Sequence, residues 1–175
     1  MKVVYSLDRV SFWLFVQLFL GHYKKLLVAM VVFSLLPLVI DTSWTMARYI
    51  LQFYVIFFGG LFLSFIIHEY LHAILLKKSR EEGELEVEFT FAKITIYPKF
   101  TLTSKEMMKV AAMPLFILLV IGLVLIIFAK WTNQNFLMFT GFLYVFHVIN
   151  IIPPLGDGMM IIKAIFHKDS TLERR

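Results

Sequence analysis

Long apolar segments separated by short polar ones dominate the chain, and they predict membrane-spanning helices. Four segments are long enough to cross the hydrocarbon core of a bilayer: residues 26–46, 49–76, 110–129 and 131–155. Residues 10–20 form a shorter apolar stretch with basic flanks. This stretch predicts either a helix in the membrane interface or a cytoplasmic helix packed on the rest of the protein. The pattern therefore predicts an all-α polytopic membrane protein whose residues 1–175 form a single domain.

One polar region, between the second and third predicted spans, has a different period. Apolar and acidic residues alternate from Glu84 to Phe89, which is the period of a strand with one buried face. A short β-hairpin or edge strand is expected within residues 84–97. Thr103 and Glu106 have the spacing of a capping box, which predicts the start of the next helix.

Composition and charge support a membrane location. Hydrophobic residues make up 60% of the chain and the mean hydropathy is +0.82, both above the values of water-soluble proteins. All but two of the 17 Lys and Arg residues lie in alternate loops. The positive-inside rule then predicts a multi-pass protein of the cell membrane with both termini in the cytoplasm. Topology thus accounts for the net charge of +5, and the expected environment is the lipid bilayer, with no nucleic acid as partner.

One His-Glu-x-x-His motif occurs in the chain, near the end of the second predicted span. Residues four apart share a helix face, so His68 and His72 can offer two imidazoles to one metal ion. Glu69 can act as a general base on a water molecule beside that ion. The chain has no cysteine, which excludes thiolate zinc sites and leaves His, Asp and Glu as ligands. The alternative is two polar histidines whose spacing carries no function.

A catalytic zinc site usually has three protein ligands, and Asp157 is the best candidate for the third. Lys78 occupies the position at which a metzincin would have a third histidine, and Glu106 is expected to cap a helix. The second and fourth spans run in the same direction, so Asp157 should reach the depth of the histidines. Its neighbouring glycines predict a turn that brings the carboxylate close. The alternative is an ordinary turn that ends a helix at the membrane surface.

Two further polar residues lie in the fourth predicted span. Asn150 could hold a substrate carbonyl or stabilise an oxyanion, or it could form an interhelical hydrogen bond. His147 lies one helical turn earlier and could face the same cavity, although a packed histidine is the more ordinary interpretation.

At these residues the sequence resembles the site-2 protease family of intramembrane zinc metalloproteases. That family combines His-Glu-x-x-His with Asn-x-x-Pro and a following Asp-Gly, which here are His68 to His72, Asn150 to Pro153, and Asp157 with Gly158. The size and the four spans are similar to those of the small bacterial zincin peptidases of the same clan. The resemblance implies that His68, His72 and Asp157 bind Zn²⁺ and that Glu69 is the base. It also implies that the strand region presents the substrate as an added strand.

The function expected is a zinc endopeptidase that hydrolyses a peptide bond of a membrane protein or peptide near the cytoplasmic leaflet. One alternative is a catalytically inactive membrane binding or partner protein that retains the metal site. Another is a small transporter subunit, which the absence of a sequence repeat disfavours. The substrate and the oligomeric state stay open.

Overall fold

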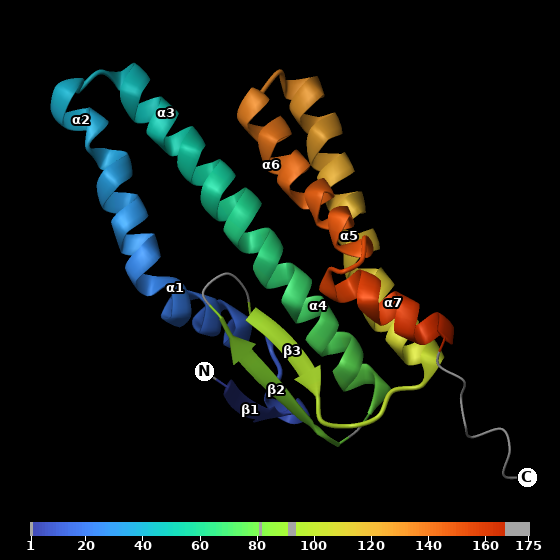
Figure 1. Cartoon of the computed structure of the whole chain (residues 1–175). Coiled ribbons are helices and arrows are strands. Elements are labelled where there is room, and N and C mark those ends of the chain that lie inside the picture. The colour runs from blue at the N-terminus through green and yellow to red at the C-terminus, as the bar shows by residue number, and fades with distance from the viewer. Residues whose placement is uncertain (1, 81, 91–93, 167–175) are drawn as a thin grey trace, which may run out of the picture.

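Four apolar helical segments and one small sheet make up the fold (Figure 1). The structure is a computed structural model that describes residues 2–80, 82–90 and 94–166. The segments long and apolar enough to cross a membrane are Phe12–Ile40, Trp44–Ser79, Ser104–Thr132 and Asn135–Phe166. A three-stranded antiparallel sheet lies at the end of the molecule opposite the two tight helix–helix turns (Figure 1). The predicted fold class, an all-α polytopic membrane protein with a short β-element, is confirmed.

The first segment is longer than its apolar pattern indicated. Helix α1 (Phe12–Leu35) begins at Ser11, whose hydroxyl accepts from Leu14 N at 3.2 Å, and it is followed by α2 (Pro37–Ile40). The prediction of a separate helix over residues 10–20 is therefore wrong. Lys24 and Lys25 do not end the helix, because both side chains are exposed and can extend into solvent while the backbone stays helical.

The second segment is continuous but changes its winding in the middle. It consists of α3 (Trp44–Tyr54), the π-helical η2 (Val55–Phe62) and α4 (Leu63–Ser79). A π-helix misaligns carbonyl groups, and the Tyr144 hydroxyl donates to the Gly59 carbonyl at 2.9 Å. Gly60 allows a close approach to the last span, because a Cβ there would lie 2.7 Å from Leu143 Cδ1.

The sheet combines two segments that are far apart in the sequence. Strands β1 (Lys2–Ser6), β2 (Glu84–Phe89) and β3 (Ile94–Pro98) are ordered β1-β2-β3, so β2 is central. The alternation predicted for β2 is present: Leu85, Val87 and Phe89 are buried. Strand β1, which pairs with β2 in the register Val4 to Glu86, was not predicted.

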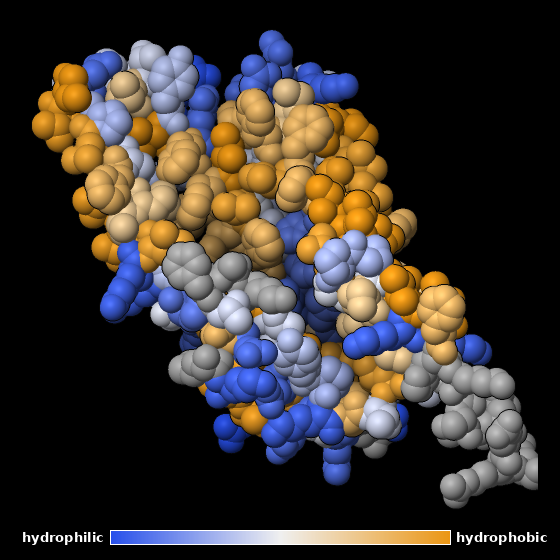
Figure 2. Space-filling model, viewed as in Figure 1, coloured by the Kyte–Doolittle hydropathy of each residue, from blue (hydrophilic) through white to orange (hydrophobic). Residues whose placement is uncertain are grey.

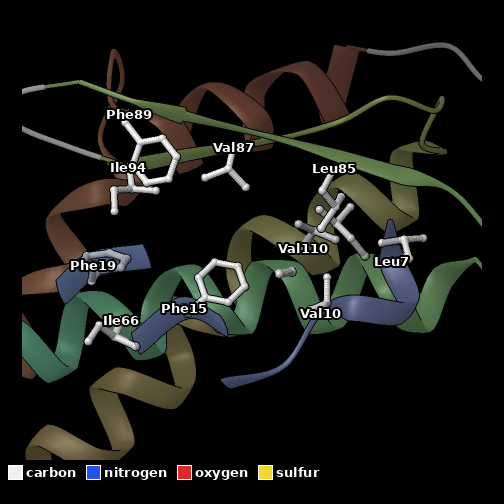
Figure 3. Packing of buried hydrophobic residues seen from close by; sticks show 12 residues of the cluster. Leu7, Val10, Phe15, Phe19, Ile66, Leu85, Val87, Phe89, Ile94 and Val110 are labelled. Carbon is white, nitrogen blue, oxygen red and sulfur yellow. The ribbon is translucent and has the colours of Figure 1, made fainter. Parts of the chain in front are cut away.

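The buried face of the sheet packs on α1 and α4 and forms the main apolar core (Figure 3). Phe15 and Ile66 contribute from the two helices, while the sheet contributes Leu85 and its buried neighbours. The short η1 (Leu7–Arg9) follows β1, and Lys77 Nζ on α4 donates to the carbonyls of Asp8 and Val10 at 3.0 and 3.2 Å. These contacts fix the end of α4 that follows the His-Glu-x-x-His motif.

The last two segments pack tightly and end in a broken helix. Helix α5 (Ser104–Thr132) starts with the predicted capping box, and α6 (Asn135–Phe146) packs closely on it. At Gly122 a Cβ would lie 2.7 Å from the Gly141 carbonyl oxygen. The chain then forms η3 (His147–Ile151) and α7 (Gly156–Phe166) instead of one helix to residue 155. Tandem prolines at residues 153–154 account for the break, because neither can donate a backbone hydrogen bond.

The polarity of the surface differs between the helical segments and the ends of the molecule. Apolar side chains cover the helical segments, and hydrophilic ones gather at the sheet and at the helix turns (Figure 2). Such an apolar band between two polar ends is the surface expected for a bilayer-embedded protein.

Candidate metal centre

His68 and His72 lie on the buried face of α4, one helical turn apart. The spacing of four residues places both rings on one side of the helix, and their Nε2 atoms are 3.1 Å apart. The side chains are 4% and 8% exposed. Two imidazoles thus direct the same ring atom toward one point inside the protein.

Asp157, in the first turn of α7, completes this group. Its Oδ1 lies 3.1 Å from His72 Nε2, and its Oδ2 lies 3.2 Å from His68 Nε2. The sequence predicted a Gly-Asp-Gly turn, whereas Gly156 begins the helix and Asp157 is helical. Gly158 permits the position, because a Cβ there would lie 2.4 Å from the Ile151 carbonyl oxygen of η3. The expected convergence of the three side chains is present.

The three residues fit a bound metal ion. One ligand atom from each lies within 4.8 Å of the others. With metal–ligand bonds of about 2.1 Å, the ligands of a tetrahedral zinc are separated by roughly 3.4 Å, close to the distances seen here. Asp157 Oδ2 is buried and has no hydrogen-bond partner within the described part of the chain. Lone pairs that converge in a buried site repel one another unless a cation lies between them.

Glu69 lies beside this group on α4 and is half-buried. Its carboxylate is close enough to His72 and to Tyr23 on α1 for its charge to act on both. A carboxylate next to a metal centre is positioned to exchange protons with a water molecule there. Tyr23 was not singled out from the sequence, since nothing in its local pattern distinguishes it from the other aromatic residues of α1.

A family comparison agrees with this geometry. The profile of the family described as "Putative zincin peptidase" matches residues 61–172, which is more than half of the chain. The chain belongs to this family. No curated protein and no solved structure matches the chain.

The zincin peptidase match includes every residue of the candidate site, from His68 to Asp157. The family description names a zinc-dependent peptidase, and the four apolar segments fit a membrane metallopeptidase. The donor set agrees with this assignment, because two imidazoles and one carboxylate are common ligands of catalytic zinc and leave a position open for substrate.

His147 lies against the candidate metal centre. Its ring stacks on the His68 ring with centroids 4.9 Å apart and an interplanar angle of 25°. Its Nε2 is 3.1 Å from Ser64 Oγ, and the ring is buried. The sequence indicated that His147 could face the cavity, but Ser64 was not singled out as a site residue. The spacing of four between Ser64 and His68, which puts both on one helix face, was the available signal.

Asn150 lies three residues after His147, in η3, and is half-buried. Within the described residues its side chain forms no hydrogen bond across helices. A role toward substrate therefore stays a prediction, and so do the individual roles of Glu69 and the three metal ligands.

Proposed function

We propose that the protein is an intramembrane zinc endopeptidase of the site-2 protease type. The observation that carries this proposal is the meeting of His68, His72 and Asp157 from two apolar segments, with Glu69 beside them. Ionisable groups within a membrane-spanning segment are costly and are retained where they serve function. The His-Glu-x-x-His motif lies in the last third of the Trp44–Ser79 segment, which supports cleavage near one leaflet, and the charge distribution favours the cytoplasmic one.

The chemistry proposed is hydrolysis of a peptide bond. His68, His72 and Asp157 would hold a zinc ion, which would supply the Lewis acidity for hydrolysis. Glu69 accepts a proton from the attacking water as its oxygen bonds to the carbonyl carbon. The same carboxyl group then donates that proton to the amide nitrogen as the C–N bond breaks, which yields a carboxylic acid and an amine. Asn150 is proposed to donate to the carbonyl oxygen as negative charge develops.

The substrate proposed is an extended segment of a membrane protein or peptide. A helical peptide bond is already engaged in hydrogen bonds, so cleavage requires local unwinding. Strand β3 is an edge of the sheet and packs on α4, the helix that carries the motif. A substrate strand added along β3 would therefore lie beside the metal centre.

The decisive experiment compares wild type with Glu69→Gln. Both would be co-expressed with a panel of epitope-tagged single-span membrane peptides, and the cleavage products would be followed by immunoblotting. Loss of the general base should lower the cleavage rate about 10²- to 10⁴-fold. Glu69→Gln should still bind zinc, because Glu69 is not one of the three proposed ligands.

The outcomes separate the candidate functions. Cleavage by wild type that disappears in Glu69→Gln would support the protease. Equal cleavage by both proteins would exclude Glu69 as the base. Stoichiometric zinc without any Glu69-dependent cleavage would favour a membrane partner protein that retains a metal site.

A further inference from the structure

Ser64 anchors the His147 ring by a hydrogen bond. Ser64 Oγ lies 2.9 Å from the Leu61 carbonyl oxygen and 3.1 Å from His147 Nε2. A hydroxyl carries one proton and a carbonyl oxygen can only accept, so the Ser64 proton is directed to Leu61. His147 must therefore donate from Nε2 to Ser64 Oγ. This bond ties the ring to α4 and sets its tautomer.

His68 lacks the hydrogen bond that usually supports a metal-binding histidine. Such histidines donate their second ring nitrogen to a carbonyl or carboxylate, which fixes the ring orientation. The Nδ1 atom of His68 is buried and has no hydrogen-bond partner among the described residues. The His68 ring therefore needs another constraint.

The ring of His147 lies where it can supply that constraint. It covers one face of His68, and Phe65 packs edge-on against His147 with centroids 4.7 Å apart. Rotation of the His68 side chain would have to displace His147, which Ser64 holds in place. Ser64 and His68 belong to α4, whereas His147 belongs to η3. The stacking of His147 on His68 therefore also joins the helix that carries the motif to the segment that precedes Asp157.

We propose that His147, anchored by Ser64, is a positioning residue that holds the zinc ligand His68 by ring stacking instead of a hydrogen bond. This inference rests on the proposed zinc site. It assigns to Ser64 and His147 a role in metal affinity and in the geometry of the bound metal. It also predicts that zinc affinity depends more on the presence of an aromatic ring at residue 147 than on the nitrogen atoms of that ring.

The test measures metal binding by purified protein in detergent, with no substrate needed. Zinc affinity would be determined by competition with a chelator, and the visible spectrum of the Co²⁺-substituted protein would report ligand geometry. Loss of a residue that supports a metal ligand typically weakens metal binding 10- to 100-fold, and this range is expected for His147→Ala, with a shifted Co²⁺ spectrum. His147→Phe should lose less, because a phenyl ring can still stack on His68.

A double-mutant cycle isolates the anchor. Ser64→Ala should weaken zinc binding in the wild-type background and have no further effect in His147→Phe, where the hydrogen bond is already absent. Ser34→Ala is the matched control, because Ser34 also bonds to a helix carbonyl and to a second side chain, Tyr54, away from the metal centre. It should leave zinc affinity unchanged. Gel filtration of each variant would verify that it is folded.

The results distinguish this inference from the proposed function. Zinc affinity within about twofold of wild type for Ser64→Ala and for both His147 variants would overturn the positioning role while the zinc site stands. Absence of zinc in wild type would instead overturn the proposed function. If His147→Ala does not fold, the other variants decide the question. The positioning role then requires that Ser64→Ala, His147→Phe and the double variant all lose zinc affinity by the same factor.

Discussion

Asp157 Oδ1 and His72 Nε2 lie 3.1 Å apart, although α7 and α4 belong to different membrane-spanning segments. The contact joins the segment with the His-Glu-x-x-His motif to the segment that follows η3. Neither segment alone supplies three ligands. The candidate metal centre therefore forms only when the two segments are packed together, and metal binding would stabilise that packing.

The first prediction concerns the third ligand. Purified wild type should contain about one zinc ion per chain, and Asp157→Ala should lose most of it, because two imidazoles alone bind zinc weakly. Elemental analysis of detergent-solubilised protein measures both. Glu82→Ala, which removes an exposed carboxylate that is not one of the three proposed ligands, is the control and should keep its zinc. Full zinc content in Asp157→Ala would exclude Asp157 as a ligand.

The second prediction is that alanine substitutions at the two glycines that flank Asp157 affect zinc affinity differently. Gly158→Ala should weaken zinc binding about tenfold or more, because the new Cβ would meet the Ile151 carbonyl oxygen of η3 at 2.4 Å and shift the start of α7, which carries Asp157. At Gly156 an added Cβ meets nothing within 4 Å, so Gly156→Ala should bind zinc like wild type. Chelator competition measures both variants. Equal affinities would show that α7 can shift without moving the carboxylate.

The third prediction concerns the core beneath the sheet. Phe15 is 1% exposed, whereas Phe33 on the same helix is 69% exposed. Phe15→Ala should lower the free energy of unfolding by about 3–5 kcal/mol, as expected for loss of a buried phenyl ring. Phe33→Ala should change it by about 0.5 kcal/mol or less. Denaturation in detergent micelles gives both values, and similar losses for the two variants would contradict the packing described for α1.

The fourth prediction concerns orientation, and the absence of cysteine makes it simple to test. Single cysteines at Thr42 and Asn135 would lie at the helix turns, and one at Glu82 would lie beside the sheet. A membrane-impermeant maleimide should label the first two in intact cells and the third only after permeabilisation, because the basic residues cluster at the sheet end. Trp44 and Trp131, which are 84% and 82% exposed near the turns, fit an outer aromatic belt. The reverse labelling pattern would invert the topology.

Local patterns were sufficient for most of the helices and for the hairpin. The alternation in Glu84–Phe89 and the capping box at Thr103 are determined by neighbouring residues, and both are present. Strand β1 was missed because its partner β2 follows only after two membrane segments, and a five-residue stretch carries too little periodicity alone. The length of α1 was underestimated because Lys24 and Lys25 were taken as a boundary.

Part of the candidate site was predictable from the sequence, because ionisable residues are rare in apolar segments. His68, His72 and Asp157 stand out for this reason, and their convergence follows from the direction of the spans. The helical start at Gly156 did not follow, since Gly-Asp-Gly is more typical of a turn. The stacking of His147 on His68 also could not be derived, because the rotation of η3 relative to α4 depends on tertiary packing.

The central position of β2 has a consequence for the order in which the protein is made. Strand β1 is synthesised first, but its hydrogen-bonding partner leaves the ribosome only after two membrane segments have been made. Until β2 and β3 have been made, β1 has no strand to pair with. The apolar side chains of α1 that the sheet will cover also stay without their contacts to the sheet. Closure of this sheet is therefore a late event of biogenesis.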